Sequence, residues 1–103
     1  MLNEDVTITQ ETTINGVKFT IKGRVNSNNA PAVQHKLDEA LRAGRYHIVL
    51  NMSHVDFLSS AGIMVILKTH KDATRAGGSF GIEHPSENVR NVLGMAALNE
   101  MLV

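Results

Sequence analysis

Hydrophobic and polar residues alternate along the first part of the chain, which is the pattern of β-strands with one buried face. In residues 17–22 every second side chain is apolar, and residues 6–10 show the same alternation. Asn15 and Gly16 separate the two runs, and both residue types accept the positive φ of a type I′ turn. The pattern therefore predicts an N-terminal β-hairpin whose second strand ends at Gly23.

Apolar residues three and four positions apart predict a helix after this hairpin. Residues 26–29 form a polar segment of N-cap candidates, Pro31 suits a first helical turn, and Gly44 suits the C-terminal end. The main interpretation of segment 26–29 is helix capping, and a contribution to a binding surface is the alternative. The side chains expected on the buried stripe of the helix are Val33, Leu37, Ala40 and Leu41.

A strand followed by a helix is predicted in the centre of the chain. Residues 48–50 are an unbroken aliphatic run, which is typical of a strand buried on both faces. The tetrad Ser59, Ser60, Ala61 and Gly62 follows, and apolar side chains then recur at helical spacing at Ile63, Ile66, Leu67 and Ala73. Two hydroxyl groups are therefore expected at the start of a helix, where free backbone N–H groups and the positive end of the helix dipole can receive an anion.

The last third of the chain predicts one more strand and helix. Gly77 and Gly78 end the preceding helix, residues 79–82 suit a short strand, and Pro85 with Ser86 begins a helix. The residues expected to face inward from this helix are Val89, Val92, Leu93 and Ala96. The predicted order is β-β-α-β-α-β-α, and strands joined through helices should lie parallel. The predicted fold class is α/β, with a mixed β-sheet, an N-terminal hairpin and helices packed against the sheet.

Composition limits the classes of function. The chain of 103 residues has no cysteine, so we expect one compact domain over residues 1–103 without disulfides or thiolate metal sites. No apolar run is long enough to cross a membrane, and residues 1–5 lack the features of a signal peptide, so we expect a cytoplasmic protein without direct membrane insertion. The formal net charge of zero gives no attraction to nucleic acid, which we therefore do not expect as a partner.

The chain lacks the spacing of the common catalytic and metal-binding motifs. Neither Ser59 nor Ser60 lies in a Gly-x-Ser-x-Gly elbow, and nothing in the sequence shows that the nearby His54 and Asp56 converge on a hydroxyl group. The five histidines do not form His-Glu-x-x-His, and the glycine pair 77–78 has no Walker lysine. We therefore expect no enzyme activity, no metal and no cofactor.

Three central segments, residues 48–51, 55–63 and 65–67, closely resemble the STAS domain of bacterial anti-sigma factor antagonists. Residues 23–25 are similar to the approach to the first helix of that family, and residues 77–78 are similar to its turn before the next strand. Pro85, Val89, Leu93 and Leu98 resemble its closing helix. The resemblance extends over nearly the whole chain and implies a single STAS-like domain.

The resemblance implies a role in partner switching. In that scheme the unmodified antagonist binds an anti-sigma serine kinase and displaces the sigma factor. The kinase then phosphorylates the antagonist, the complex separates, and a serine phosphatase resets the cycle. The family pattern is commonly Asp-Ser-Ser/Thr-Gly, which puts Ser59 at the aspartate position, Ser60 at the acceptor position and Ala61 at the third. Ser60 is the implied phosphorylation site, and Ser59 is the second candidate.

A set of partner-binding residues follows from the resemblance and from the exposure expected of two segments. Asn26 stands where family members often carry an aspartate, and Met64 falls on a different helix face from Ile63 and Ile66, beside the serines. An exposed, flexible thioether suits an adaptable interface. The expected set is Asn26, Ser27, Asn28, Ser59, Ser60, Ala61, Gly62 and Met64.

The alternative function is that of a constitutive STAS adaptor in a larger assembly, such as a lipid-transport complex. In that case the Ser60 hydroxyl serves only as the N-cap of its helix, a role that it is also expected to have before any phosphorylation. A serine kinase gene beside this one would favour the switch, and transporter subunit genes would favour the adaptor.

Overall fold

The computed structural model describes residues 5–103; residues 1–4, on which the expectation about a signal peptide largely rests, lie outside the described part. The predicted order of strands and helices is confirmed, with one short 3₁₀ helix added near the end. The elements are β1 (Val6–Thr12), β2 (Gly16–Val25), α1 (Ala30–Arg42), β3 (His47–Leu58), α2 (Ser60–Arg75), β4 (Ser79–Glu83), α3 (Glu87–Met95) and η1 (Asn99–Met101).

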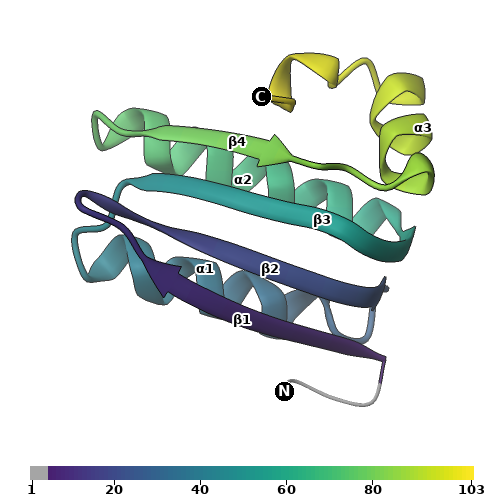
Figure 1. Ribbon diagram of the computed structural model, residues 1–103, viewed down its shortest axis with the longest axis horizontal. Coiled ribbons are helices and arrows are strands. Elements are labelled where there is room, and N and C mark those ends of the chain that lie inside the picture. The colour runs from purple at the N-terminus through teal and green to yellow at the C-terminus, as the bar shows by residue number, and fades with distance from the viewer. Residues whose placement is uncertain (1–4) are drawn as a thin grey trace.

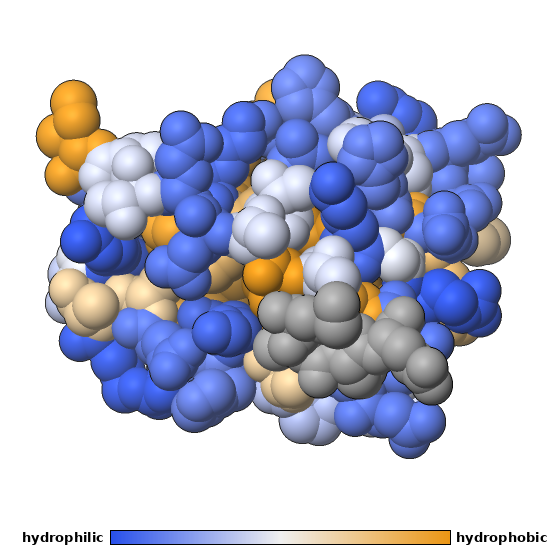
Figure 2. All heavy atoms as spheres, turned by 60° about the horizontal axis from the view of Figure 1, so that its bottom comes forward, coloured by the Kyte–Doolittle hydropathy of each residue, from blue (hydrophilic) through white to orange (hydrophobic). Residues whose placement is uncertain are grey.

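The four strands form one mixed sheet in the order β1-β2-β3-β4. β1 pairs antiparallel with β2, whereas β2, β3 and β4 run parallel, as the crossovers through helices require (Figure 1). The side of the molecule nearest β1 is mostly hydrophilic, with scattered apolar patches (Figure 2). The predicted mixed sheet with an N-terminal hairpin is therefore confirmed.

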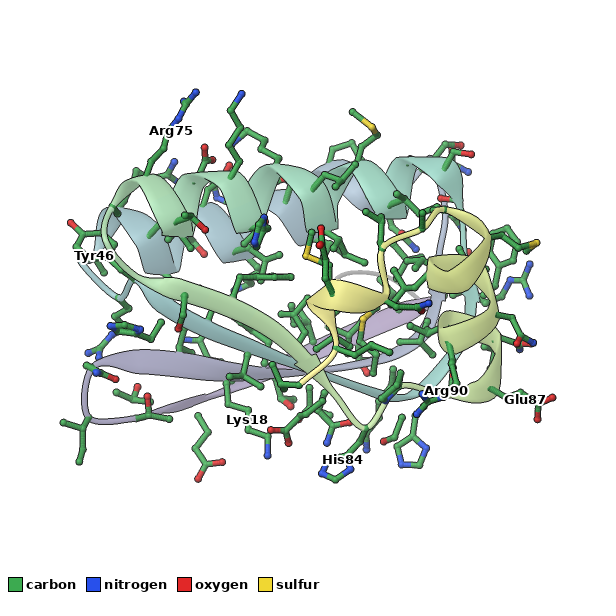
Figure 3. All side chains as sticks on the ribbon, turned by 90° about the horizontal axis from the view of Figure 1, so that it is seen from above. Lys18, Tyr46, Arg75, His84, Glu87 and Arg90 are labelled. Atoms are coloured by element: carbon green, nitrogen blue, oxygen red, sulfur yellow. The ribbon has the colours of Figure 1, made fainter. Side chains whose placement is uncertain are left out.

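Helices α1 and α2 lie on the same face of the sheet, as Figure 3 shows edge-on. The core fills the space between these helices and the sheet. It contains the fully buried side chains of Phe19, Ile21, Leu37, Ile48, Leu50, Met52, Ile66 and Ile82. Val49 points to the other face and is only partly buried. The expectation that residues 48–50 are buried on both faces was wrong, because these two helices cover one face only.

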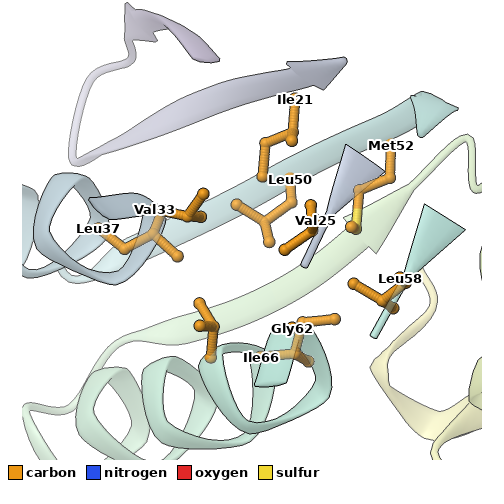
Figure 4. Close-up of a pocket in the computed structure, with 10 residues that line it drawn as sticks. Ile21, Val25, Val33, Leu37, Leu50, Met52, Leu58, Gly62 and Ile66 are labelled. Atoms are coloured by element: carbon orange, nitrogen blue, oxygen red, sulfur yellow. The ribbon is translucent and has the colours of Figure 1, made fainter. Parts of the chain in front are cut away.

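A cavity of about 10 Å³ remains in this core between the sheet and the two helices (Figure 4). Its lining is entirely apolar: Ile21, Val25, Val33, Leu37, Leu50, Met52, Leu58, Gly62, Val65 and Ile66. That volume matches about one water molecule, and the lining offers a water no hydrogen-bonding side chain. It is a packing gap rather than a ligand site.

The hairpin is present, but its turn is not of the predicted type. Neither Asn15 nor Gly16 has a positive φ, and the two strands are joined by residues 13–15, with the Thr13 N–H donating to the Gly16 carbonyl at 3.0 Å. A Cβ at position 16 would overlap the backbone carbonyl oxygen of His47. The glycine is needed there because β3 approaches closely, not because the turn is left-handed.

Two further details correct the predicted boundaries. Gly23, with φ of +106°, does not end β2, which continues to Val25. Ala96 lies one residue beyond the end of α3 and is exposed, whereas Val89 and Leu93 are buried as expected. Among residues 5–103, no helix has the length and hydropathy that a membrane span requires.

Strand β3 contains two irregularities in its pairing with β2 that change which side chains face outward. The register shifts between Thr20 and Lys22 and again between Gly23 and Arg24, and β3 supplies one extra residue at each place. The buried residues of this part of β3 are therefore three positions apart, at Met52, Val55 and Leu58.

Candidate functional site

The two serines lie where β3 passes into α2. Leu58 ends the strand and Ser60 begins the helix, while the Ser59 N–H donates to the Val25 carbonyl at 2.9 Å and joins this point to the end of β2. The Ser59 hydroxyl accepts a hydrogen bond from the Gly62 N–H at 3.2 Å. Ser59 is therefore the N-cap, and the expectation that Ser60 has this role was wrong.

Ser60 is the first residue of α2, and its side chain is exposed to solvent. Among residues 5–103 it receives or donates no side-chain hydrogen bond, so neither His54 nor Asp56 contacts it as a base. The same residues contain no group of three His, Asp or Glu side chains that could hold a metal ion. The exposed hydroxyl is thus open to a partner or a modifying enzyme, and within residues 5–103 no histidine holds it in the arrangement of a hydrolase triad.

Gly62 sits under the first turn of α2 and is buried. A Cβ at this position would lie 2.5 Å from Leu58 Cδ1 and 3.0 Å from Val25 Cγ1. The absence of a side chain allows α2 to start directly against the carboxyl ends of β2 and β3. Gly62 therefore shapes the site by close packing and lies below the surface on which the serines stand.

The polar loop before α1 is held by hydrogen bonds between its own residues. The Asn26 side-chain oxygen accepts from the backbone N–H groups of Asn28 and Asn29, each at 3.0 Å, and the Asn29 side-chain oxygen accepts from the Asn26 N–H at 2.9 Å. Asn29 occupies the N-cap position, but its side chain makes no cap bond. The segment does cap the start of the helix, but through Asn26, whose side-chain oxygen accepts the N–H groups two and three residues on, while Ser27 and Asn28 are exposed.

A groove of about 390 Å³ connects this loop with α2. It runs between the N-terminal halves of α1 and α2 and is lined by Ser27, Ala30, Pro31, Gln34, Ala61, Met64, Val65 and Lys68. Met64 is 63% exposed, as expected. Three members of the expected partner-binding set, Ser27, Ala61 and Met64, thus line the same groove although they are far apart in sequence.

Polar side chains contact one another at the end of the groove that lies away from Ser27, where Gln34 and Lys68 line it. Lys68 contacts Asp38 at 3.5 Å and Asp72 at 2.7 Å, and the hydrogen bond to Asp72 raises the pKa of the Lys68 ammonium group above its usual value. Gln34 donates to Asp38 at 3.0 Å and to the buried Thr69 hydroxyl at 3.1 Å. Two of these contacts, Gln34 with Thr69 and Lys68 with Asp38, join α1 to α2 along the groove.

The family model of the STAS domain matches residues 5–102. The chain belongs to the STAS domain family.

This STAS chain has relatives and structural neighbours that are consistent with the resemblance described from its sequence. It is 26% identical over 83 residues to the anti-sigma F factor antagonist of Paenibacillus polymyxa, which covers 80% of this chain and 71% of that protein. It is 31% identical over 72 residues to BtrV of Bordetella bronchiseptica, named as a candidate anti-sigma factor antagonist, which covers 70% of this chain and 62% of BtrV.

The STAS fold is also seen in the solved structures of the anti-sigma factor antagonist SpoIIAA. The unphosphorylated form matches with a TM-score of 0.84 at 18% identity, over 94% of this chain and 86% of SpoIIAA. The phosphorylated form, from Bacillus, matches with a TM-score of 0.77 at 18% identity, over 94% of this chain and 89% of SpoIIAA. At this identity the likeness concerns the fold, and it confirms the predicted α/β architecture.

One surface feature beside the serines was missed by the analysis of the sequence. Arg24 and Phe57 are paired in the β2–β3 register, and the guanidinium carbon of Arg24 lies 4.6 Å from the centre of the Phe57 ring. The signal for it was the three-residue spacing of Met52, Val55 and Leu58, which indicates an irregular strand. Regular alternation would instead have put Phe57 on the same face as Val55.

Proposed function

We propose that this STAS protein is an anti-sigma factor antagonist that works by partner switching in the cytoplasm. In its unphosphorylated form it binds an anti-sigma serine kinase, and phosphorylation of Ser60 releases it; a serine phosphatase restores the binding form. It acts as a binding protein rather than as an enzyme. The observation that carries the proposal is the exposed Ser60 hydroxyl at the start of α2, beside the groove lined by Ser27, Ala61 and Met64.

The relatives support the general role. The Paenibacillus polymyxa protein is an anti-sigma F factor antagonist, and SpoIIAA has been solved in both unphosphorylated and phosphorylated forms. The same fold therefore exists with and without a phosphate in SpoIIAA, which supports phosphorylation as the switch proposed for this protein. In this chain Ser59 is engaged as the N-cap while Ser60 is exposed, which favours Ser60 over Ser59 as the acceptor.

The position of Ser60 favours a phosphate without a change of fold. Phosphorylation adds roughly −1.5 to −2 charge at neutral pH, and the N–H groups and dipole at the start of α2 partly compensate it. A partner surface that excludes water from the unmodified serine has no such compensation and must solvate or pair the new charge. A cost of about 3 kcal/mol at that interface corresponds to about a hundredfold loss of affinity.

The partner contact is expected to extend from Ser60 over the exposed loop and into the groove. Asn26, Ser27 and Asn28 contribute the loop side, and Ala61 and Met64 contribute the α2 side. Gly62 acts indirectly, by allowing α2 to begin so close to β2 and β3.

The test is calorimetric titration of a cognate anti-sigma serine kinase with the unmodified and the phosphorylated protein, together with mapping of the phosphorylated residue. We expect labelling of Ser60, its loss in Ser60→Ala, continued labelling of Ser59→Ala, and about a hundredfold weaker binding of the phosphorylated form. Labelling that persists in Ser60→Ala would move the acceptor to Ser59 or elsewhere. A complete absence of labelling, or equal affinities of the phosphorylated and unmodified forms, would contradict the switch and support the constitutive adaptor.

A further inference from the structure

An exposed arginine is stacked on an exposed phenylalanine at the carboxyl ends of β2 and β3. Phe57 is 39% exposed although it is a large apolar residue, and the guanidinium of Arg24 lies over its ring at 4.6 Å from the ring centre. The second irregularity of β3 turns Phe57 outward, since Val55 and Leu58 on either side of it are buried. The fold therefore exposes this ring at the cost of regular pairing.

The backbone on which Arg24 stands is fixed from two sides. Its N–H donates to the Asp5 carbonyl at 2.8 Å, and its own carbonyl accepts from the Asn29 side chain at 2.8 Å. Asn29 is only 1% exposed, so the polar loop holds the backbone of Arg24 through a buried side chain. With its backbone fixed and its side chain stacked, the guanidinium loses little conformational freedom when it binds a further group.

The charge of Arg24 is left available for such a group. Within residues 5–103 the guanidinium forms no ion pair and no hydrogen bond, whereas Lys18 and Lys68 are both paired with carboxylates. A stacked guanidinium still presents its N–H groups at its edge, in a geometry that matches a planar carboxylate through two parallel hydrogen bonds. Arginine is also among the residue types most enriched at the energetic centres of protein interfaces, and phenylalanine is enriched in interface cores.

The position of the pair links it to the candidate partner surface. Val25 and Leu58, the next residues of the two strands, are paired with each other, and the Val25 carbonyl accepts from the Ser59 N–H. Arg24 and Phe57 therefore border the serines on the side of the strand ends, whereas the groove borders them on the helix side. A typical interface covers about 800 Å² on each partner, which is enough to include both.

We propose that Arg24, held on Phe57, binds an acidic side chain of the anti-sigma partner and helps to determine which partner is recognised. This inference rests on the proposed function and names one contact within it. The occupant is a carboxylate on the partner. The phosphate on Ser60 is the competing anion, and the experiment below distinguishes the two.

The test compares the affinity of the anti-sigma kinase for the unmodified wild-type protein and for Arg24→Gln, Arg24→Lys and Phe57→Leu. We expect Arg24→Gln to weaken binding about 10- to 30-fold and to reduce its dependence on salt, because a charged pair is lost. Arg24→Lys should recover only part of the affinity, because it keeps the charge and loses the planar fork. Phe57→Leu should also weaken binding, because the guanidinium loses its support.

The matched control is Arg75→Gln, which removes the same charge from an exposed arginine at the other end of α2 (Figure 3). It should bind like the wild type, and thermal melts should show that all variants remain folded. Equal affinities of Arg24→Gln and Arg75→Gln would overturn the inference and leave the proposed function standing. An effect of Arg24→Gln confined to the ³¹P signal of phosphorylated Ser60 would overturn it in favour of the phosphate. A wild-type protein that does not bind the kinase would instead overturn the proposed function, and the partner assigned to Arg24 with it.

Discussion

Replacing the two serines separately should distinguish the structural hydroxyl from the exposed one. Ser59→Ala removes the acceptor of the Gly62 N–H, a bond of 3.2 Å at a buried glycine. The loss of a serine N-cap costs about 1 kcal/mol, within a range of about 0.5–2 kcal/mol. For a domain of 103 residues the entropy of unfolding is about 0.22 kcal/mol/K, so the melting temperature should fall by about 4–5 °C. Ser60→Ala removes an exposed hydroxyl without a hydrogen bond and should change stability by less than about 0.5 kcal/mol.

The assay is urea and thermal denaturation followed by circular dichroism, with amide hydrogen exchange at Gly62 as a local probe. Ser59→Asp is the matched control, since aspartate is an equally good N-cap and adds a favourable negative charge at the start of α2. It should keep the wild-type midpoint, whereas Ser59→Ala should lower the midpoint and speed exchange at Gly62. Equal losses in Ser59→Ala and Ser60→Ala, or a larger loss in Ser60→Ala, would show that the cap is wrongly assigned.

Three further predictions follow from the close contacts and charges of the fold. Gly16→Val should lose about 2 kcal/mol or more of the free energy of unfolding, because the valine side chain would overlap the His47 carbonyl. Asn15→Ala should be nearly neutral in the same urea denaturation, since Asn15 has no positive φ. A larger loss in Asn15→Ala than in Gly16→Val would support the left-handed turn instead. Gly62→Ala should lose about 1–3 kcal/mol despite the better helix propensity of alanine, and a higher urea midpoint would contradict the packing described. The hydrogen bond to Glu83 raises the pKa of the Lys18 ammonium group in the folded protein. The Lys18–Glu83 pair therefore stabilises the fold at pH values below the usual lysine pKa, and this contribution is lost as the pH rises through the raised pKa. Melts of the wild type and Glu83→Gln should therefore converge at strongly alkaline pH, and a difference that persists there would refute this contribution.

The sequence by itself determined the order of the elements and the place of the serines. Hydrophobic periodicity depends only on neighbours along the chain, and it indicated the two alternating runs of the hairpin and the stripe of Val33, Leu37 and Ala40. The helices between the later strands required parallel pairing. The segment 55–63 was specific enough to indicate the family, because its serines stand between a strand and a helix.

The tertiary structure decided what individual residues do within those elements. The need for glycine at position 16 comes from the His47 backbone, which is 31 positions away, so a local turn preference gave the wrong reason for it. The Ser59 hydroxyl became the cap because β3 ends at Leu58 and α2 begins at Ser60, one residue earlier than expected. Such assignments depend on where one backbone meets another, which no local pattern records.

The binding surface was likewise decided by packing between distant segments. Ser27 and Met64 line one groove only because α1 and α2 lie side by side on the sheet. Phe57 is paired with Arg24 only because two extra residues in β3 shift its register against β2; the first turns Val55 inward and the second turns Phe57 outward again. Strand register is fixed by pairing and burial over the whole sheet, so the exposed face of an irregular strand is known only once its neighbours are in place.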